Sequence, residues 1–398
     1  MEWVDKDSGR IPIMFWSTDV EKIAMDQAIN LSRHSQTFHH VAIMPDCHPG
    51  YGMPIGGVIA CEHSIIPYAV GVDIGCGIVA TRTDIPADDM SNNDIRGIID
   101  RAGKRIPTGE GNSHRSVQSW DQFERLPSWF DKRGNDLAEK SLGTLGGGNH
   151  FLEIQAGDDG WIWLMIHSGS RNPGYRIAGH HHEKAVKFCI NNREELPSKD
   201  LSYLQVNSPD GRDYIREMEF AMDFASENRR RLMTSFKDAF TEVKGNVSFS
   251  KEVNIHHNYA ALEKHFGRKV WVHRKGATSA RKGQKGIIPG SMGTFSYIVE
   301  GLGNPDSFNS CSHGAGRVMG RREASRILSV SDCDRSMKGI VFEGWKRYKG
   351  YGRKKHGSPS LDLSEAPAAY KNIDDVMKAQ RDLVTPVVRL KPLGVVKG

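Results

Sequence analysis

Histidines, a cysteine and an aspartate recur in glycine-rich clusters that are spread over more than two hundred residues of this chain. The clusters occupy residues 71–77, 146–150, 167–171, 256–258 and 311–317. Together they offer one carboxylate, one thiol and several imidazoles, which form the ligand set of a transition-metal site. Their glycines leave a bare backbone that can approach a phosphate closely. The clusters therefore predict a metal-dependent enzyme that handles phosphorylated substrates.

The first cluster places Asp73 and Cys76 three residues apart in a glycine-rich turn. A carboxylate and a thiolate at that spacing can bind one metal, and the thiolate has lone pairs enough to bridge to a second metal. His150 comes directly before a short apolar stretch, and His167 directly after another. Either histidine alone is better explained as a buried core residue, so the prediction depends on the clusters taken together.

His313 precedes the turn 314–316, and a basic helix is predicted to begin at Arg317. Backbone N–H groups at a helix start favour a phosphate, and the same positive end would lower the basicity of a nearby histidine. Such a histidine stays neutral and nucleophilic, and it could attack an α-phosphate while metals withdraw charge from the phosphoryl oxygens. A second glycine turn at 288–293 is able to hold a nucleotide.

Buried strands and amphipathic helices are expected to position these residues. Apolar stretches predict strands, and longer amphipathic stretches predict helices, with the apolar stripe of the longest helix facing the core. The predicted strands are 41–44, 57–60, 78–80 and 161–166, and the predicted helices are 91–104, 175–191 and 212–240.

The domain organisation follows from this order of elements. Without a repeat or a long linker, the chain is expected to form a single large domain over residues 1–398, of the mixed α/β (α+β) class, with the active site on loops at strand ends. The stretch 346–360 is predicted to be a mobile basic loop within that domain.

Composition limits the class of protein. Hydrophobic residues make up 38% and charged residues 26%, no apolar run is long enough for a membrane helix, and the start lacks a secretory signal. Six cysteines without a C-x-x-C pair fit a reducing compartment, so a cytoplasmic protein is expected. The net charge of +6, with basic residues concentrated in the last third, is compatible with a polyanionic partner.

The motifs, taken in order, resemble the RtcB family of RNA-splicing ligases. They are Met44-Pro45-Asp46-x-His48-x-Gly50-x-Gly52, Val72-Asp73-Ile74-Gly75-Cys76-Gly77, Leu145-Gly146-x-Gly148-Asn149-His150-Phe151-x-Glu153, His167-Ser168-Gly169-Ser170-Arg171, His257-Asn258, Pro289-Gly290-Ser291-Met292-Gly293, Ser312-His313-Gly314-Ala315-Gly316-Arg317 and Val396-Lys397-Gly398. The resemblance implies a GTP- and manganese-dependent ligase that joins RNA 3'-phosphate or 2',3'-cyclic phosphate ends to 5'-hydroxyl ends, in tRNA splicing or RNA repair. The reaction would pass through a covalent histidine–guanylate and an RNA-3'-pp-5'-G intermediate. RNA and an archease-like activator would be the partners.

The resemblance also assigns roles to residues. His313 would be the catalytic residue that carries the guanylate, and Arg171 and Arg317 would contact the RNA phosphate. The ligands of two manganese ions would be Asp73, Cys76, His150, His167 and His257, with the thiolate bridging. The pocket for GTP, bound as GMP on the histidine, would be lined by Asn149, His150, Phe151, Leu152, Glu153, His257, Asn258, Pro289, Gly290, Ser291, Met292, Ser296, His313, Gly314, Ala315, Gly316 and Lys397.

Alternatives remain at this level. Thiolate and imidazole ligands suit zinc equally well, so manganese is indicated by the resemblance alone. A metal-dependent phosphoesterase acting on nucleic-acid termini could use the same ligands with water as nucleophile, and a non-catalytic RNA-binding module would leave the ligand set unexplained. Cys47 is expected to be a packed thiol, and the triplet 180–182 a solvated histidine cluster on a helix.

Overall fold

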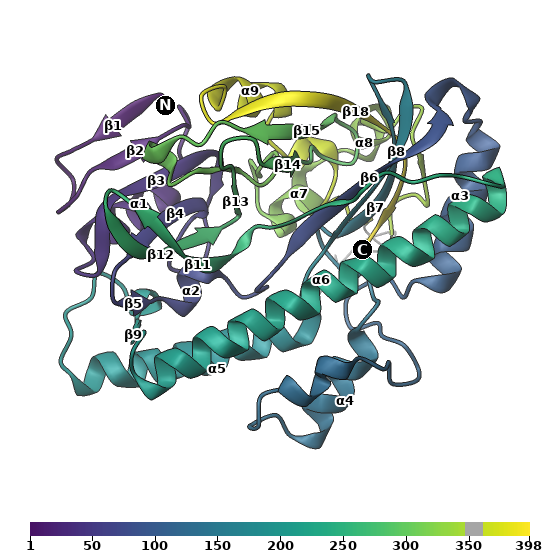
Figure 1. Cartoon of the computed structure of the whole chain (residues 1–398). Helices are drawn as coiled ribbons and strands as arrows, with labels where there is room; N and C mark the ends of the chain where they lie inside the picture. Colours follow the sequence, from purple (N-terminus) through teal and green to yellow (C-terminus); the bar gives the residue numbers. More distant parts are fainter. Residues whose placement is uncertain (347–360) are drawn as a thin grey trace, which may run out of the picture.

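The structure of the chain is a computed structural model that describes residues 1–346 and 361–398. Helices and strands are mixed along the chain, and most of the strands form two large sheets (Figure 1). The mixed α/β class expected from the sequence is therefore confirmed. The predicted basic loop at 346–360 lies, apart from Lys346, outside the described residues.

The first large sheet has the strand order β1-β2-β3-β4-β12-β11. Its pairs are antiparallel except for β2 and β3, which run parallel. Two of the predicted strands, 41–44 and 57–60, form its centre. The strands are β1 (Trp3–Asp5), β2 (Ile13–Phe15), β3 (Thr37–His48), β4 (Ile55–Cys61), β11 (Asn258–His265) and β12 (Arg268–Lys275).

The second large sheet has the order β10-β6-β8-β7-β18-β15-β14, and β17 pairs with β18 at one end. Its outer strands β10 and β14 lie against each other, so the sheet curls towards a barrel. The predicted strands 78–80 and 161–166 lie in this sheet. The strands are β6 (Gly77–Pro86), β7 (Phe151–Gly157), β8 (Trp161–Ser168), β10 (Val253–His256), β14 (Lys285–Ile288), β15 (Ser296–Gly301), β17 (Val341–Phe342) and β18 (Val384–Lys397).

The three long helices are α3 (Asn92–Arg105), α5 (Arg171–Asn191) and α6 (Pro209–Lys244), which correspond to the three predicted helices. Of these, α3 and α6 pack on the second sheet, and α5 packs on α6 and on α2 (Pro67–Val70) (Figure 1). Ser91 caps α3 in a capping box with Asp94, and Ser208 accepts a hydrogen bond from the Gly211 N–H at the start of α6.

The predicted apolar stripe of α6 faces the core. Leu232, Phe236 and Phe240 are buried against β6, β8 and α3. Full burial of each such side chain is worth about 1.5–3 kcal/mol.

Shorter elements fill the remaining connections. The helices among them are α1 (Lys22–Arg33), α2 (Pro67–Val70), α4 (Lys132–Ser141), α7 (Arg321–Ile327), α8 (Val330–Ser336) and α9 (Ile373–Ala379). The strands among them are β5 (Ser64–Ile65), β9 (Leu204–Gln205), β13 (Ala277–Ser279) and β16 (Ser310–Ser312), which form the two-stranded sheets β5-β9 and β13-β16.

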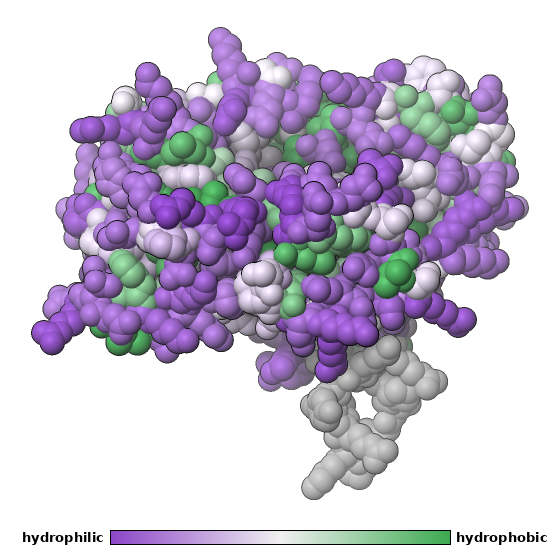
Figure 2. All heavy atoms as spheres, turned by 60° about the horizontal axis from the view of Figure 1, so that its bottom comes forward, coloured by the Kyte–Doolittle hydropathy of each residue, from purple (hydrophilic) through white to green (hydrophobic). Residues whose placement is uncertain are grey.

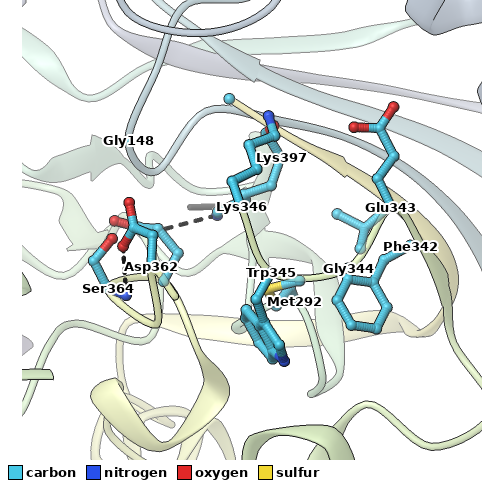
Figure 3. A pocket seen from close by; sticks show the side chains of 13 residues that line it. Gly148, Met292, Phe342, Glu343, Gly344, Trp345, Lys346, Asp362, Ser364 and Lys397 are labelled. Carbon is cyan, nitrogen blue, oxygen red and sulfur yellow. Dashed lines mark hydrogen bonds and ion pairs between the residues drawn. The ribbon is translucent and has the colours of Figure 1, made fainter. Parts of the chain in front are cut away.

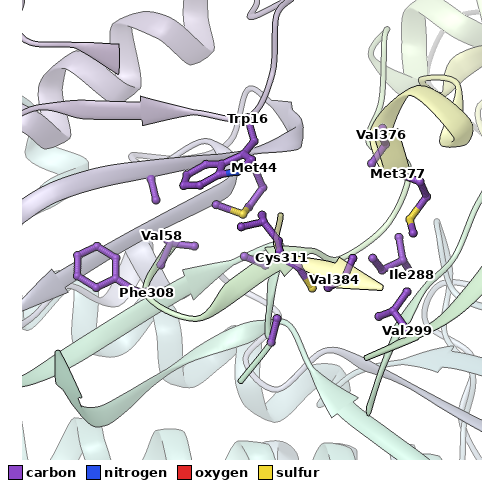
Figure 4. Close-up of a cluster of buried hydrophobic side chains, with 14 of the residues drawn as sticks. Trp16, Met44, Val58, Ile288, Val299, Phe308, Cys311, Val376, Met377 and Val384 are labelled. Atoms are coloured by element: carbon purple, nitrogen blue, oxygen red, sulfur yellow. The ribbon is translucent and has the colours of Figure 1, made fainter. Parts of the chain in front are cut away.

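An apolar cluster between the two large sheets joins them (Figure 4). Trp16, Met44 and Val58 from the first sheet and its loops meet Ile288 and Val299 of β14 and β15 there. All five side chains are buried, so this cluster fixes the first sheet against the second and sets the positions of the loops that extend from both.

The outer surface is mainly polar. On the face shown in Figure 2, hydrophilic side chains predominate and hydrophobic ones appear in small groups. Across residues 1–346 and 361–398, no helix has the length and apolarity needed to span a membrane.

Candidate active site

One cavity collects the predicted site clusters at the ends of strands from both large sheets and β16. Its lining includes Asp73, Cys76, His167, His257 and His313, which are separated by up to 240 residues along the chain. Cys76 directly precedes β6, His167 is the penultimate residue of β8, and His257 lies between β10 and β11. The expectation of a site at strand ends is therefore confirmed.

The predicted metal ligands form a continuous chain of close contacts. His150 Nε2 lies 3.3 Å from Asp73 Oδ2 and 3.4 Å from Cys76 Sγ. His167 Nε2 lies 3.3 Å from Cys76 Sγ and 3.3 Å from His257 Nε2. Metal bonds of about 2.0–2.3 Å in a tetrahedral site separate neighbouring ligand atoms by roughly 3.3–3.7 Å, so this spacing is that of a metal-binding cluster.

Burial makes ionisation of the cluster unfavourable unless a cation is bound. Burial and the neighbouring Asp73 carboxylate raise the pKa of the Cys76 thiol well above its usual value. Burial also lowers the pKa values of His167 and His257, so both imidazoles are neutral and carry a lone pair. A bound cation would stabilise the thiolate and use these lone pairs, so the donor set fits a metal.

Backbone carbonyls orient two of the imidazoles. His150 Nδ1 lies 2.9 Å from the Leu145 carbonyl oxygen, and His167 Nδ1 lies 3.2 Å from the Asn149 carbonyl oxygen. Because a carbonyl only accepts, Nδ1 of His167 carries the hydrogen and Nε2 presents its lone pair to the cluster. Nδ1 of His150 faces both the Leu145 carbonyl, which accepts, and the Arg171 guanidinium at 3.0 Å, which donates.

Two glycines make this close packing of loops feasible. Gly75, between the predicted ligands Asp73 and Cys76, has a φ of +74° and packs against the backbone of Met222 in α6. A Cβ at Gly169 would lie 2.4 Å from the Asp73 carboxylate oxygens. Side chains at either position would displace the ligand loop, which explains glycine in both motifs.

His313 is not followed directly by the basic helix predicted from Arg317, and the predicted start of that helix was wrong. It follows strand β16, and α7 begins only at Arg321, because positive-φ Gly316 and then Gly320 interrupt a helical path. The proposed influence of a helix start on His313 therefore does not apply.

The Asp46 carboxylate holds His313 instead. Asp46 Oδ2 lies 2.6 Å from His313 Nδ1 and accepts backbone N–H groups from His313 at 3.1 Å and Gly314 at 3.3 Å. Asp46 is fully buried, and the ring of His313 lies 4.8 Å from that of His257, measured between centroids. Because an ionised carboxylate only accepts, Nδ1 carries the hydrogen and Nε2 keeps the nucleophilic lone pair.

The role of Asp46 was missed at the sequence level. It stands in a glycine-rich motif together with His48, but 267 residues separate it from His313. The place of Asp46 in that motif was a signal of a functional role, but it could not show that the partner of Asp46 is His313.

A second pocket adjoins the cavity at Lys397, which lines both (Figure 3). Met292, Phe342 and Trp345 form its apolar side, and the carboxylate of Glu365 belongs to its polar side. Burial opposes ionisation of Glu365, but Lys397, Arg321 and Arg317 together hold its pKa at about 2.

Glu153 lies buried near the same lysine. Gln155 donates a hydrogen bond to Glu153 Oε2 at 2.7 Å and another to the Ser296 hydroxyl at 3.1 Å. Burial raises the pKa of Glu153 to about 7, partly opposed by Lys397. The Lys397 ammonium also lies over the Phe151 ring, 5.3 Å from its centroid. The buried Glu153 carboxylate and the Phe151 ring therefore both lie near one ammonium.

The remaining pocket residues divide into two groups. Leu152 packs in the hydrophobic core with Val396 and is absent from the lining of both cavities. The lining also lacks four other predicted residues that lie buried nearby, His150, Glu153, Ser291 and Ser296. The predicted residues that line one of the cavities are Asn149, Phe151, His257, Asn258, Pro289, Gly290, Met292, His313, Gly314, Ala315, Gly316 and Lys397.

The predicted phosphate contacts are held by internal interactions. Arg171 Nη1 lies 3.0 Å from His150 Nδ1 beside the ligand cluster. Arg317 lines the cavity and donates to the Ser364 carbonyl at 2.6 Å and the Tyr370 hydroxyl at 3.2 Å. Both guanidinium groups lie at the site, and each is fixed by neighbouring side chains.

Not every basic residue near the motifs lies at the surface. Arg274 is fully buried and pairs with Glu263 at 2.6 Å. Arg274 thus belongs to the interior.

The histidine triplet is not solvated, contrary to expectation. His181 is fully buried and its Nε2 lies 2.7 Å from Glu217 of α6, and His182 stacks on Tyr68 with ring centroids 3.6 Å apart. Helix α5 is covered on more than one side by α2, α4 and α6, which explains the burial. Cys47 is buried, as predicted, and burial raises its pKa to about 11.

The fold and the cavity together define a mixed α/β protein with a metal-compatible site beside exposed backbone turns. Comparison with known proteins agrees with this class. A family model described as tRNA-splicing ligase RtcB matches residues 27–128 and 121–398.

Curated relatives cover nearly the whole chain. RNA-splicing ligase RtcB of Escherichia coli K12 is 39% identical over 414 residues, with 97% of each chain covered. The tRNA-splicing ligase RtcB of Pyrobaculum aerophilum is 31% identical, covering 99% of this chain and 96% of the relative. RNA-splicing ligase RtcB of Mycobacterium tuberculosis is 32% identical, with 89% and 96% covered. The chain belongs to the RtcB family of RNA-splicing ligases.

Proposed function

We propose that this protein is an RNA ligase that joins RNA 3'-phosphate or 2',3'-cyclic phosphate ends to 5'-hydroxyl ends through a covalent guanylate on His313. The observation that carries the proposal is the placement of His313 in one cavity with the chain of metal-ligand side chains. A nucleophilic imidazole beside a cation site is suited to attack on a phosphorus atom.

Two manganese ions are proposed for the cluster, one bound by Asp73, Cys76 and His150, and the other by Cys76, His167 and His257. The support is the order of contacts, in which Cys76 Sγ stands between the two groups. When bound, the metals would withdraw charge from phosphoryl oxygens and stabilise the leaving group.

The guanylate is proposed to extend from His313 past Lys397. Guanine presents adjacent N–H donors, and the buried Glu153 carboxylate can accept both of them, while Phe151 offers a ring face and Ser296 a hydroxyl. Met292 and the polar Glu365 side of the second pocket adjoin the same lysine. In the turn 314–316, the backbone N–H groups of Ala315 and Gly316 are proposed to bind the phosphates. The N–H groups of Gly290 and Ser291 already donate to the hydroxyls of Ser296 and Thr294.

The reaction then proceeds by three displacements. His313 Nε2 bonds to the α-phosphorus of GTP as the bond to the β-phosphate oxygen breaks and pyrophosphate leaves. An oxygen of the RNA 3'-phosphate takes the guanylate from His313, which gives RNA-3'-pp-5'-G. The 5'-hydroxyl, losing its proton, then attacks the RNA phosphorus and GMP leaves. Activation is needed because a phosphate monoester lacks a good leaving group.

The RNA phosphate is proposed to lie between Arg171, which lies beside His150, and Arg317, which lines the cavity. A 2',3'-cyclic phosphate would first be opened by hydrolysis. Residues 1–398 are proposed to work as one domain, because β18 supplies Lys397 to the sheet that also contains β6, β7 and β8 from the first half of the chain. An archease-like activator remains a prediction.

Incubation with GTP labelled at the α-phosphate tests the proposal. We expect metal-dependent label on the protein, and His313→Ala should abolish it while the unfolding temperature is retained. A metal-dependent phosphoesterase would trim RNA termini without trapping label. Label that persists undiminished on His313→Ala would refute the assignment of the guanylate carrier.

A further inference from the structure

Two strongly exposed tyrosines lie at and near the mouth of the cavity. Tyr51 is 68% exposed and lines the cavity, and Tyr175, in the second turn of α5, is 65% exposed. An aromatic side chain contributes most when it is buried, so exposure of this extent leaves a ring face available to a ligand. Neither residue has a role in the site described above.

A buried lysine ties the first tyrosine to a third one. The Lys275 ammonium is buried without a carboxylate contact within salt-bridge distance among residues 1–346 and 361–398. It donates to the backbone carbonyls of both Tyr51 and Tyr68, the latter at 3.0 Å. These two carbonyls therefore share one ammonium, which fixes the loop carrying Tyr51 to helix α2, which carries Tyr68.

Helix packing brings the second exposed tyrosine to the same place. α2 packs on α5, and the Tyr68 ring stacks on His182 with an angle of 10° between the planes. Tyr175 precedes His182 by seven residues, so both lie on one face of α5, about 10 Å apart along the axis. Burial raises the pKa of Tyr68, and the nearby charges of Asp200, Tyr175, Glu183 and Tyr51 raise it further.

Tyr51 at the cavity, Tyr68 on α2 and Tyr175 on α5 thus lie near one another, and these three side chains are here named the tyrosine strip. Its surroundings favour base faces over phosphates as ligands. Asp200 and Glu183 lie beside Tyr68 and would repel a phosphate, whereas stacking on an aromatic ring does not depend on charge.

We propose that the tyrosine strip binds unpaired nucleobases of the RNA strand whose end occupies the cavity. This inference rests on the proposed ligase function, because Tyr51 of the strip lines the cavity that would receive the RNA end. Single-stranded RNA is recognised largely by stacking of unpaired bases on aromatic side chains. Tyr51 would contact a base nearer the joined end, and Tyr175 a base further along the strand.

Steady-state ligation of single-stranded RNA at saturating GTP tests the strip. Alanine replacement of a stacking aromatic weakens binding by roughly 5- to 150-fold, so Tyr175→Ala and Tyr51→Ala should raise KM for RNA within that range. Tyr175→Phe should retain the wild-type KM because the ring remains. Ile190→Ala is the matched control, since Ile190 is 66% exposed near the other end of α5.

Guanylate trapping without RNA separates this inference from the proposed function. The Tyr175→Ala protein should trap label from GTP at the wild-type rate, because no RNA is required for that step. Absence of trapping in the wild-type protein would overturn the proposed function itself. Trapping with an unchanged KM for RNA in both alanine variants would overturn the strip alone.

Abasic RNA identifies the contact directly. Bases are removed from the RNA one position at a time. At one position, the abasic RNA should bind the wild-type protein more weakly than intact RNA does, whereas Tyr175→Ala should bind the abasic and the intact RNA equally. For Tyr51→Ala that position should lie closer to the joined end. If the effect of each alanine variant is the same at every abasic position, the tyrosines do not stack on bases and the surface would serve another class of partner.

Discussion

The contact between Asp46 and His313 allows a specific prediction for Asp46→Asn. Asparagine keeps the shape of aspartate but removes its charge, while His313 gains positive charge when Nε2 bonds to phosphorus. Oδ2 lies 2.6 Å from Nδ1, so the carboxylate is about 4 Å from the centre of the charged ring. Two unit charges at that separation interact by about 4 kcal/mol at an effective dielectric constant of about 20.

Part of this interaction survives in the variant, because an amide oxygen can still accept the hydrogen bond. Since each 1.36 kcal/mol corresponds to about tenfold in rate, we expect guanylate transfer to slow by about 10²- to 10³-fold. Asp46 Oδ1 is buried without a hydrogen-bond partner in the described part of the chain. An amide nitrogen there would lower the free energy of unfolding by about 1–3 kcal/mol.

The assay is the single-turnover rate of label transfer from α-labelled GTP to the protein, with GTP affinity and chemical denaturation measured in parallel. Asp374→Asn is the control. The Asp374 carboxylate accepts a hydrogen bond of 2.7 Å from the Tyr297 hydroxyl, and Asp374 does not line the cavity. A rate for Asp46→Asn within about threefold of wild type, in a folded protein, would show that the carboxylate does not assist His313.

Three further predictions concern the metal cluster, the guanylate pocket and the core. Cys76→Ser should lower bound metal at least about tenfold in elemental analysis after dialysis, whereas buried Cys333→Ser should retain it; equal metal in both variants would exclude Cys76 as a ligand. Because the pKa of Glu153 is about 7, GTP affinity measured by calorimetry should rise as pH increases from 6 to 8, by up to about tenfold per unit below 7. Glu153→Gln should remove this dependence, and an unchanged slope would contradict the role of the carboxylate. Burial lowers the pKa of His273 from 6.5 to about 4, so the folded state holds this imidazole neutral at a pH where the unfolded chain would protonate it. The free energy of unfolding should therefore be unaffected by this group above pH 6.5 and should fall as pH decreases from 6.5 towards 4, by at most about 3 kcal/mol. Denaturant unfolding of His273→Gln should show a weaker loss between pH 7 and 5 than the wild type, and an equally steep loss would argue against this residue as the source.

Local patterns predicted the elements of this fold well. The strands around Val58 and Ile166 are short apolar runs that end at polar turns, and the apolar stripe through Leu232 has helical spacing. Each of these patterns lies within a single helix or strand, so it can be recognised from the local sequence without knowledge of the tertiary structure.

Contacts between distant elements were less predictable. His181 is buried because three helices surround α5, and no pattern within residues 171–191 reveals those neighbours. The late start of α7 after His313 depends in part on Gly316, whose left-handed conformation is set by packing, since a Cβ there would lie 2.2 Å from the Asp46 carbonyl oxygen. The partnership of Asp46 with His313 has the same origin.

Strand β18 has a consequence for damaged forms of the protein. It lies in the interior of the second sheet, with β7 on one side and β15 on the other. A chain shortened before Val384 would expose two unpaired strand edges together with the apolar residues that cover them. Such edges readily pair with other chains, so shortened products would aggregate or be degraded rather than persist as soluble inactive fragments competing for RNA.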